Sequence, residues 1–137
     1  MKIRPRRLRK TEAIRNLLSE TRLHPASFVM PYFVCEGRGM KKAIATLEGQ
    51  YRFSIDCLLE ELDSLMKTGI RSILLFGIPK TKDLTAREAF SPKGIVQEAT
   101  RKIKREFPEL VVIADTCVCA YMSHGHCGVV SGKEIVN

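Results

Sequence analysis

The sequence predicts an α/β fold built on a parallel sheet, and three observations lead to that prediction. Apolar, strand-like segments recur three times along the chain, at 28–34, 71–76 and 110–115. Between them lie two segments with the apolar spacing of amphipathic helices. Each helix returns the chain for parallel pairing, through crossovers that are right-handed by rule. The 137 residues suit a single domain.

The first 24 residues carry most of the positive charge. They hold eight Lys or Arg and two acidic residues, a net charge of +6 out of +8 for the whole chain. Thr11 is the predicted cap of a short helix over 11–23. A basic arm can contact nucleic acid, an acidic membrane face or an acidic neighbouring subunit, or it can simply be solvated. Because it lacks aromatic side chains and any nucleic-acid-binding motif, we do not expect specific nucleic-acid binding.

The first predicted strand, 28–34, reads FVMPYFV and is rich in β-forming residues. Pro31 has no N–H to donate, so this strand must run where the missing donor is tolerated. Residues 36–39 (EGRG) end the strand. We interpret 40–52 as a loop with turn chemistry at Glu48 and Gly49.

Ser54 is the predicted cap of the first long helix, which runs to about Thr68 and stops at Gly69. Its apolar face comprises Ile55, Leu58, Leu59, Leu62, Leu65 and Met66. The strand at 71–76 follows and ends at Gly77-Ile78-Pro79, after which we expect a long polar loop.

Pro92 opens the second long helix near its first turn, and the helix runs to about Phe107. The third strand, 110–115 (LVVIAD), is continuously apolar until its last residue, so we predict that it is buried. No glycine-rich phosphate fingerprint follows any strand, which argues against dinucleotide binding. Two architectures remain open at this point, an open doubly wound sheet and part of a barrel of alternating strands and helices.

Composition excludes several classes of protein. The chain is 45% hydrophobic and 28% charged, unlike collagen-like, disordered or disulfide-scaffold chains. No apolar run approaches the roughly 20 residues of a membrane span. The N-terminus is basic but lacks the apolar stretch of a signal peptide. Five cysteines, three of them within eleven residues, indicate reduced thiols with a metal or thiol role. We therefore expect a cytoplasmic protein without membrane partners.

The segment 115–128 (DTCVCAYMSHGHCG) concentrates three cysteines, two histidines and an aspartate. Thiolates and imidazoles are the usual zinc ligands, and a catalytic zinc takes three protein ligands. Two alternatives remain, a redox disulfide within Cys-x-Cys and three inert packing thiols. Cys35 and Cys57 lie elsewhere and are interpreted as structural. The candidate metal ligands are Cys117, Cys119 and Cys127.

This segment closely resembles the zinc-cysteine signature of the porphobilinogen synthase family, also called delta-aminolevulinic acid dehydratase. The resemblance extends over the chain, through RPRRLRK near the N-terminus, PYFVCEG in the first strand and LLFGIP in the second. The family usually has Pro where Ala120 stands and Thr where Met122 stands. Neither departure affects the three cysteines.

The resemblance implies a particular α/β fold, the N-terminal part of a (β/α)8 TIM barrel with about three strands and two helices, preceded by an extended N-terminal arm. Residues 1–27 would be the oligomerisation arm and 28–137 the first part of the barrel, ending after the cysteine loop. Family members assemble into homo-octamers through this arm. They are zinc-dependent hydro-lyases that condense two 5-aminolevulinate molecules, with loss of water, to porphobilinogen in tetrapyrrole (heme) biosynthesis.

The same resemblance implies roles for individual residues. Cys117, Cys119 and Cys127 would hold one catalytic Zn2+, and Asp115 would orient groups near that metal as the candidate catalytic residue. His126 matches a position that contributes to an accessory metal site in some members, so a further Zn2+ or Mg2+ is implied. For His124 a structural role in the loop is an equal alternative.

Two lysines form Schiff bases with the substrates in this family, and both come from later barrel strands. No lysine of this chain is carried over as a catalyst, and Lys133 is expected to be exposed. We therefore expect that the chain is truncated, holds about half of a barrel of roughly 250 residues, and is inactive and aggregation-prone alone because apolar sheet surface faces water. The alternative is a small zinc-binding module with a basic nucleic-acid-binding arm, which a steep salt dependence of RNA or DNA affinity would favour.

Overall fold

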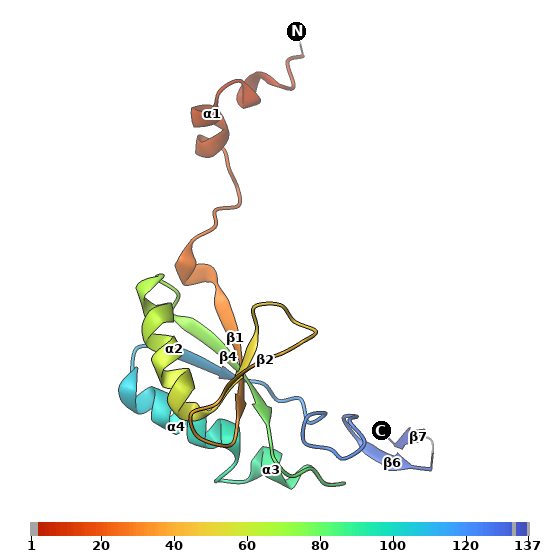
Figure 1. Cartoon of the computed structure of the whole chain (residues 1–137). Coiled ribbons are helices and arrows are strands. Elements are labelled where there is room, and N and C mark those ends of the chain that lie inside the picture. Colours follow the sequence, from red (N-terminus) through yellow and green to blue (C-terminus); the bar gives the residue numbers. More distant parts are fainter. Residues whose placement is uncertain (1–2, 133, 137) are drawn as a thin grey trace.

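A computed structural model describes residues 3–132 and 134–136, so Lys133 lies outside the described residues. The described chain has a five-stranded sheet with two long helices on one face, and an N-terminal segment that projects away from it (Figure 1). A small separate hairpin follows the sheet, formed by β6 (Val129–Ser131) and β7 (Glu134–Val136). No helix in the described ranges is long and apolar enough to cross a membrane.

The predicted parallel sheet is confirmed. All seven residues of β1 (Val29–Cys35) pair in parallel with β4 (Ser72–Ile78), and β5 (Val111–Ala114) pairs in parallel with the first half of β4. The connections contain α2 (Ile55–Lys67) and α4 (Ile95–Glu106). The long helices and the parallel strands β1, β4 and β5 therefore follow the predicted order of strand, helix, strand, helix, strand.

The prediction of a loop over 40–52 is wrong. That segment contains β2 (Lys41–Ala43) and most of β3 (Tyr51–Phe53), which pair antiparallel and place β3 beside β1 in the sheet order β2-β3-β1-β4-β5. Strands of three residues are too short to show an alternating pattern in the sequence. Because β3 pairs only with Phe33 and Val34 of β1, Pro31 lies beyond its reach and costs no bond to β3.

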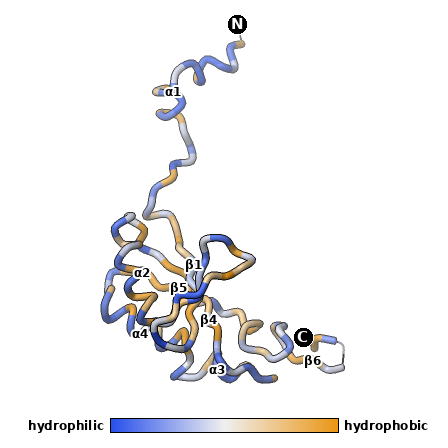
Figure 2. The backbone as a smooth tube through the Cα atoms, in the orientation of Figure 1, coloured by the Kyte–Doolittle hydropathy of each residue, from blue (hydrophilic) through white to orange (hydrophobic). Residues whose placement is uncertain are grey.

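The apolar core lies between the sheet and the two long helices. Figure 2 shows apolar colouring concentrated on the strands and helices of this body, and polar colouring along much of the N-terminal segment. Fully burying one Val, Leu or Ile side chain stabilises a fold by about 1.5 to 3 kcal/mol. The fully buried residues include Val34, Leu58, Leu62, Ile73, Leu75, Ala99, Ile103 and Leu110.

The prediction that the third strand is buried is also wrong. Val111 is 53% exposed and Ile113 is 42% exposed, whereas Val112 packs against the core. Alternate residues of a strand point to opposite faces, and α2 and α4 both lie on the same face (Figure 1). Among the described residues, the other face of the sheet has no covering helix, and on it Phe33 of β1 and Phe76 of β4 stack with ring centroids 5.2 Å apart.

The helix boundaries follow local signals with three differences. Gly69 stops α2 with a φ of +88°, as predicted. Ser54 precedes α2, but its Oγ accepts a bond from Met40 N at 2.8 Å instead of capping the helix. α4 begins at Ile95 and not at Pro92, because the chain first forms α3 (Arg87–Phe90), a short helix within the predicted polar loop.

The third difference concerns the N-terminal segment. It contains η1 (Arg7–Arg9), α1 (Glu12–Leu17) and η2 (Pro25–Ser27). Thr11 caps α1 as predicted, accepting a bond from Ile14 N at 3.2 Å. The helix ends at Leu17 and not at Leu23, because none of its residues is buried and a helix this short gains little stability without packing.

Candidate metal centre

The cysteine loop begins at the carboxyl end of β5, where functional residues of parallel sheets are usually found. Asp115 follows β5 directly, and its N–H donates to the carbonyl of Leu75 at 3.1 Å, which continues the pairing with β4. The loop leaves the sheet just after this bond. β4 and β5 therefore determine where the first cysteine starts.

The three predicted ligand cysteines lie together. The Sγ of Cys127 is 3.4 Å from that of Cys117 and 3.0 Å from that of Cys119. All three sulfurs lie within 4.8 Å of one another. Among the described residues, they form the group of side chains arranged to bind a metal ion. The three thiols are free, with Cys117 and Cys127 exposed. The geometry therefore favours neither a disulfide nor three buried packing thiols.

Hydrogen bonds among the three sulfurs shift the pKa values of two of the thiols in opposite directions. The hydrogen bond between Cys119 and Cys127 raises the pKa of Cys119 to about 11 and lowers the pKa of Cys127. Of these two thiols, Cys127 is the one that ionises more readily. Soft thiolates select Zn2+ over hard cations such as Mg2+, and metal binding displaces the remaining thiol protons. The chemistry of this donor set fits zinc.

Two features of the chain return Cys127 to the other cysteines. A turn brings the N–H groups of Tyr121 and Met122 to the carbonyl of Val118, at 2.9 and 3.1 Å. Gly125 then adopts a φ of +77°, in the left-handed region that favours glycine. The turn and the reversal together bring the chain back over the eight positions that separate Cys127 from Cys119.

The loop is clamped to the segment after β4 by backbone bonds. Asp83 N donates to the carbonyl of Tyr121 at 3.2 Å, and Ser123 N donates to the carbonyl of Asp83 at 3.0 Å. Tyr121 and Met122 are buried there with Ala86. These bonds hold the middle of the cysteine loop against a second, preceding loop.

The side chain of Asp83 orders that preceding loop. Its carboxylate accepts bonds from the N–H and hydroxyl of Thr85, at 2.7 and 2.8 Å, and from Arg87 Nε at 3.0 Å. These bonds, those of Thr85 first, lower the pKa of Asp83 to about 2. Because the folded-state pKa is depressed, the ionised carboxylate stabilises the fold above its usual pKa of about 4, and that contribution disappears as pH falls through about 2.

Replacing Asp83 with asparagine is therefore expected to lower the melting temperature modestly at pH 7, by a few degrees at most, since the Arg87 pair is solvent-accessible. The difference from the parent protein should shrink between about pH 4 and pH 2 as the parent carboxylate becomes protonated. Melting curves at several pH values check this. Asp63→Asn, at an exposed helix pair with Lys67, is the control. A pH-independent difference at position 83 contradicts the assignment.

The remaining predicted site residues lie around the triad without joining it. Asp115 and Cys117 line the same cavity of about 640 Å3, beside Tyr121. His126 is exposed, its N–H donates to His124 Nδ1 at 3.2 Å, and the two imidazole rings stack with centroids 6.0 Å apart. His126 is not part of the thiol cluster.

The other two cysteines are placed apart from the triad. Cys35 is buried at the end of β1, where its thiol donates to the carbonyl of Phe53 at 3.4 Å. Cys57 is half-buried on α2 and packs against the core. Both positions agree with a structural role.

The residues that support the loop are not predicted by the sequence. The ring of Tyr121 lies against Gly77 at the end of β4. The backbone of Asp83 is hydrogen-bonded to that of Tyr121. In the sequence, Gly77 indicates only the end of a strand, and Asp83 is one residue of a polar loop. Nothing in the local sequence indicates that these positions meet.

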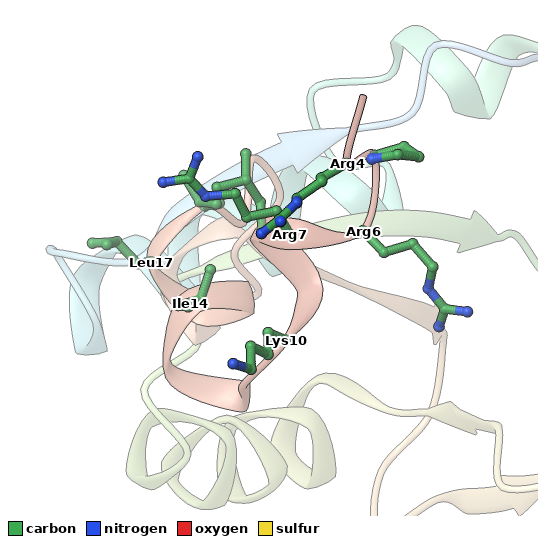
Figure 3. Close-up of a pocket in the computed structure, with 9 residues that line it drawn as sticks. Arg4, Arg6, Arg7, Lys10, Ile14 and Leu17 are labelled. Atoms are coloured by element: carbon green, nitrogen blue, oxygen red, sulfur yellow. The ribbon is translucent and has the colours of Figure 1, made fainter. Parts of the chain in front are cut away.

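A second hollow lies on the N-terminal segment, remote in sequence from the cysteine loop. Figure 3 shows it, with Arg4, Arg6, Arg7 and Lys10 around Ile14 and Leu17. Its volume is about 830 Å3. The apolar residues Leu8, Leu17 and Leu23 of this segment are more than half exposed, so the segment presents apolar as well as basic surface.

Comparison with known proteins gives one consistent result. The family model for delta-aminolevulinic acid dehydratase matches residues 2–137. Among curated proteins of that name, the one from Bacillus subtilis (strain 168) is 48% identical over 134 residues, covering 98% of this chain and 41% of the relative. The one from Methanothermobacter thermautotrophicus is 50% identical over 136 residues, covering 98% and 41%.

Two further comparisons agree. The relative from Ruminiclostridium josui is 44% identical over 134 residues, covering 98% of this chain and 65% of the relative. A crystal structure of delta-aminolevulinic acid dehydratase (porphobilinogen synthase) from Toxoplasma gondii ME49, in complex with the reaction product porphobilinogen, superposes with a TM-score of 0.92 at 34% identity. The superposition covers 100% of this chain and 40% of the Toxoplasma gondii chain. The chain thus spans between two-fifths and two-thirds of the length of these relatives.

Proposed function

The chain belongs to the delta-aminolevulinic acid dehydratase family, and from that premise we propose that it forms part of a porphobilinogen synthase. This hydro-lyase condenses two 5-aminolevulinate molecules, with loss of water, to porphobilinogen in tetrapyrrole biosynthesis. The observation that carries the proposal is the cluster of three free thiols at the carboxyl end of β5. The related Toxoplasma gondii protein holds porphobilinogen, which supports the same product here.

Cys117, Cys119 and Cys127 are proposed to hold one catalytic Zn2+, since the donor set is entirely sulfur and lies within 4.8 Å. When bound, zinc supplies a Lewis acid that polarises a substrate oxygen and acidifies bound water. The role of the protein is to supply and orient the thiolates. The hydrogen bond with Cys119 lowers the pKa of Cys127, which favours the thiolate form that a cation binds.

Asp115 is proposed to orient substrate or water beside this centre. It lines the same cavity as Cys117, and its backbone is fixed by the bond to Leu75. In the family, two lysines form Schiff bases with the substrates, and both come from later barrel strands. We propose that these lysines belong to the part of the relatives' length that this chain does not match.

His126 is proposed to contribute to an accessory metal site that takes Zn2+ or Mg2+. Its imidazole is exposed, and only its backbone N–H is used in the bond to His124. A neutral imidazole is the commonest metal ligand among protein side chains. The accessory site is separate from the thiol cluster.

The fold is proposed to be the first part of a (β/α)8 barrel, over 28–137. Two observations support this. The sheet has one helix-covered face and one exposed apolar face, and the second is the face that a closed barrel would bury. Within residues 3–132 and 134–136, β5 is an edge strand of the sheet, and an edge can pair with a further strand.

Residues 1–27 are proposed to be an oligomerisation arm in a cytoplasmic homo-octamer. Its described part, residues 3–27, projects from the sheet (Figure 1) and exposes both basic and apolar side chains. Surfaces of that kind are buried in stable assemblies. Deleting residues 1–24 is therefore expected to reduce the assembly to smaller oligomers, as measured by size-exclusion chromatography with light scattering. An unchanged mass would contradict the arm assignment.

The proposed activity is tested on the protein as the gene expresses it, with its intact mass recorded. Purified protein is expected to contain zinc and to convert 5-aminolevulinate into a pyrrole detected colorimetrically. Chelation should abolish turnover and zinc should restore it. Zinc-loaded protein of the relatives' length without turnover would overturn the proposal. The alternative, a zinc module that binds nucleic acid, instead requires an RNA or DNA affinity that falls steeply with salt.

A further inference from the structure

Gly77 of β4 lies against the cysteine loop, and its backbone conformation does not explain why this residue is a glycine. Its φ is not among the positive values of the described glycines, so an alanine backbone is tolerated there. A Cβ on Gly77, however, would lie less than 3.0 Å from both the Oη of Tyr121 and the Cγ2 of Val96. Nonbonded carbon and oxygen atoms do not approach so closely. Glycine is required at this position for space.

The space is filled by one side chain of the cysteine loop. Tyr121 is 6% exposed, and its ring packs over Gly77 and beside Val96. Tyr121 closes the turn that starts at Val118, through its own N–H and that of Met122. The first two ligand cysteines flank Val118 directly in the sequence. A displacement of the Tyr121 ring therefore moves the turn that contains Cys119 and directly follows Cys117.

We propose that Gly77 is a positioning residue for the thiol triad, because its missing side chain provides the seat in which Tyr121 anchors the cysteine loop. The inference rests on the proposed metal site. A Cβ at position 77 would push the ring away by roughly 1 Å, whereas zinc holds each sulfur at about 2.3 Å. Loss of a residue that directly orients a metal ligand typically weakens metal affinity by about 10- to 100-fold, and we expect a loss in the same range here.

The test measures Co2+ binding to the protein as expressed, by its thiolate-to-cobalt charge-transfer absorption and by competition with a chelator. Gly77→Ala is expected to bind Co2+ about 10- to 100-fold more weakly, with a weaker absorption per bound ion. The combined variant Gly77→Ala/Val96→Ala/Tyr121→Phe removes both clashing atoms and is expected to recover most of the affinity. Recovery distinguishes a steric displacement of the loop from general destabilisation.

Gly49→Ala is the matched control. Gly49 has a φ of +76°, and a Cβ added there would meet no atom within 4 Å, so alanine strains the backbone without touching the site. It should lower the melting temperature and leave Co2+ affinity unchanged. Wild-type affinity in a folded Gly77→Ala variant overturns the inference, and so does an equal loss in Gly49→Ala or no recovery in the combined variant.

Two further outcomes are also decisive. Where Gly77→Ala does not fold, Tyr121→Leu replaces it, because this change leaves β4 intact and removes the ring from its seat. Wild-type Co2+ affinity in Tyr121→Leu overturns the inference, and a loss of about 10- to 100-fold supports it. Absence of Co2+ and Zn2+ binding in the unmodified protein instead overturns the proposed metal site, so the two failures are distinguishable.

Discussion

Replacing Cys127 with serine is expected to lower zinc affinity by more than about 100-fold, the upper range for losing only a supporting residue of a metal ligand. The Sγ of Cys127 lies 3.4 Å from that of Cys117 and 3.0 Å from that of Cys119. The hydrogen bond with Cys119 also lowers the pKa of the Cys127 thiol and raises that of Cys119. A serine hydroxyl stays protonated at neutral pH and is a poor zinc ligand.

Cys57→Ser is the matched control for this change. Cys57 lies half-buried on α2 and outside the thiol cluster, so zinc affinity should remain at the parent value even if stability falls. Zinc content and chelator competition provide the readout. Retention of zinc in Cys127→Ser with parental affinity would contradict the triad assignment, and simultaneous loss of zinc in Cys57→Ser would point to unfolding.

Replacing Leu62 with alanine is expected to destabilise the fold by about 2 to 5 kcal/mol. Leu62 lies at the centre of α2 and is 0% exposed, within the core between the helices and the sheet. Truncation removes buried apolar surface and leaves a cavity that close-packed neighbours fill only in part. Urea denaturation followed by circular dichroism measures the change.

Leu84→Ala is the control for the core substitution. Leu84 is 69% exposed in the loop before α3, so the same truncation should change stability by no more than about 0.5 kcal/mol. Similar effects at positions 62 and 84 would contradict the position of the core. A large effect at Leu62 with parental Co2+ affinity in the folded fraction would show that the core and the metal centre are separable.

Local signals account for the parts of the fold that are predicted correctly. The apolar spacing of 54–68 and 92–107 identifies both helices, and Gly69 indicates a stop that the structure confirms with a φ of +88°. Each of these signals acts within a few residues of its own position. The same holds for Thr11, which caps α1 through a bond to a residue three positions away.

Errors arise where distant segments decide the outcome. The segment 40–52 becomes a hairpin because β3 pairs with Phe33 and Val34 of β1, and short strands gain their stability from such partners. The apolar run of β5 predicts burial, yet Val111 and Ile113 are exposed because both long helices lie on the other face. An apolar run shows that a strand tolerates burial, and its neighbours decide whether burial occurs.

The sequence alone determined the order of strands and helices, the identity of the three cysteines and the family resemblance, because each is carried by residue type and short-range spacing. Only the tertiary structure decided that the three sulfurs lie within 4.8 Å, that Asp83 clamps the loop and that Gly77 makes room for Tyr121. The last two facts depend on contacts between residues that are far apart in the sequence. The physical reason is that hydrogen-bond partners and steric space are set by the packing of separate elements, which no local pattern encodes.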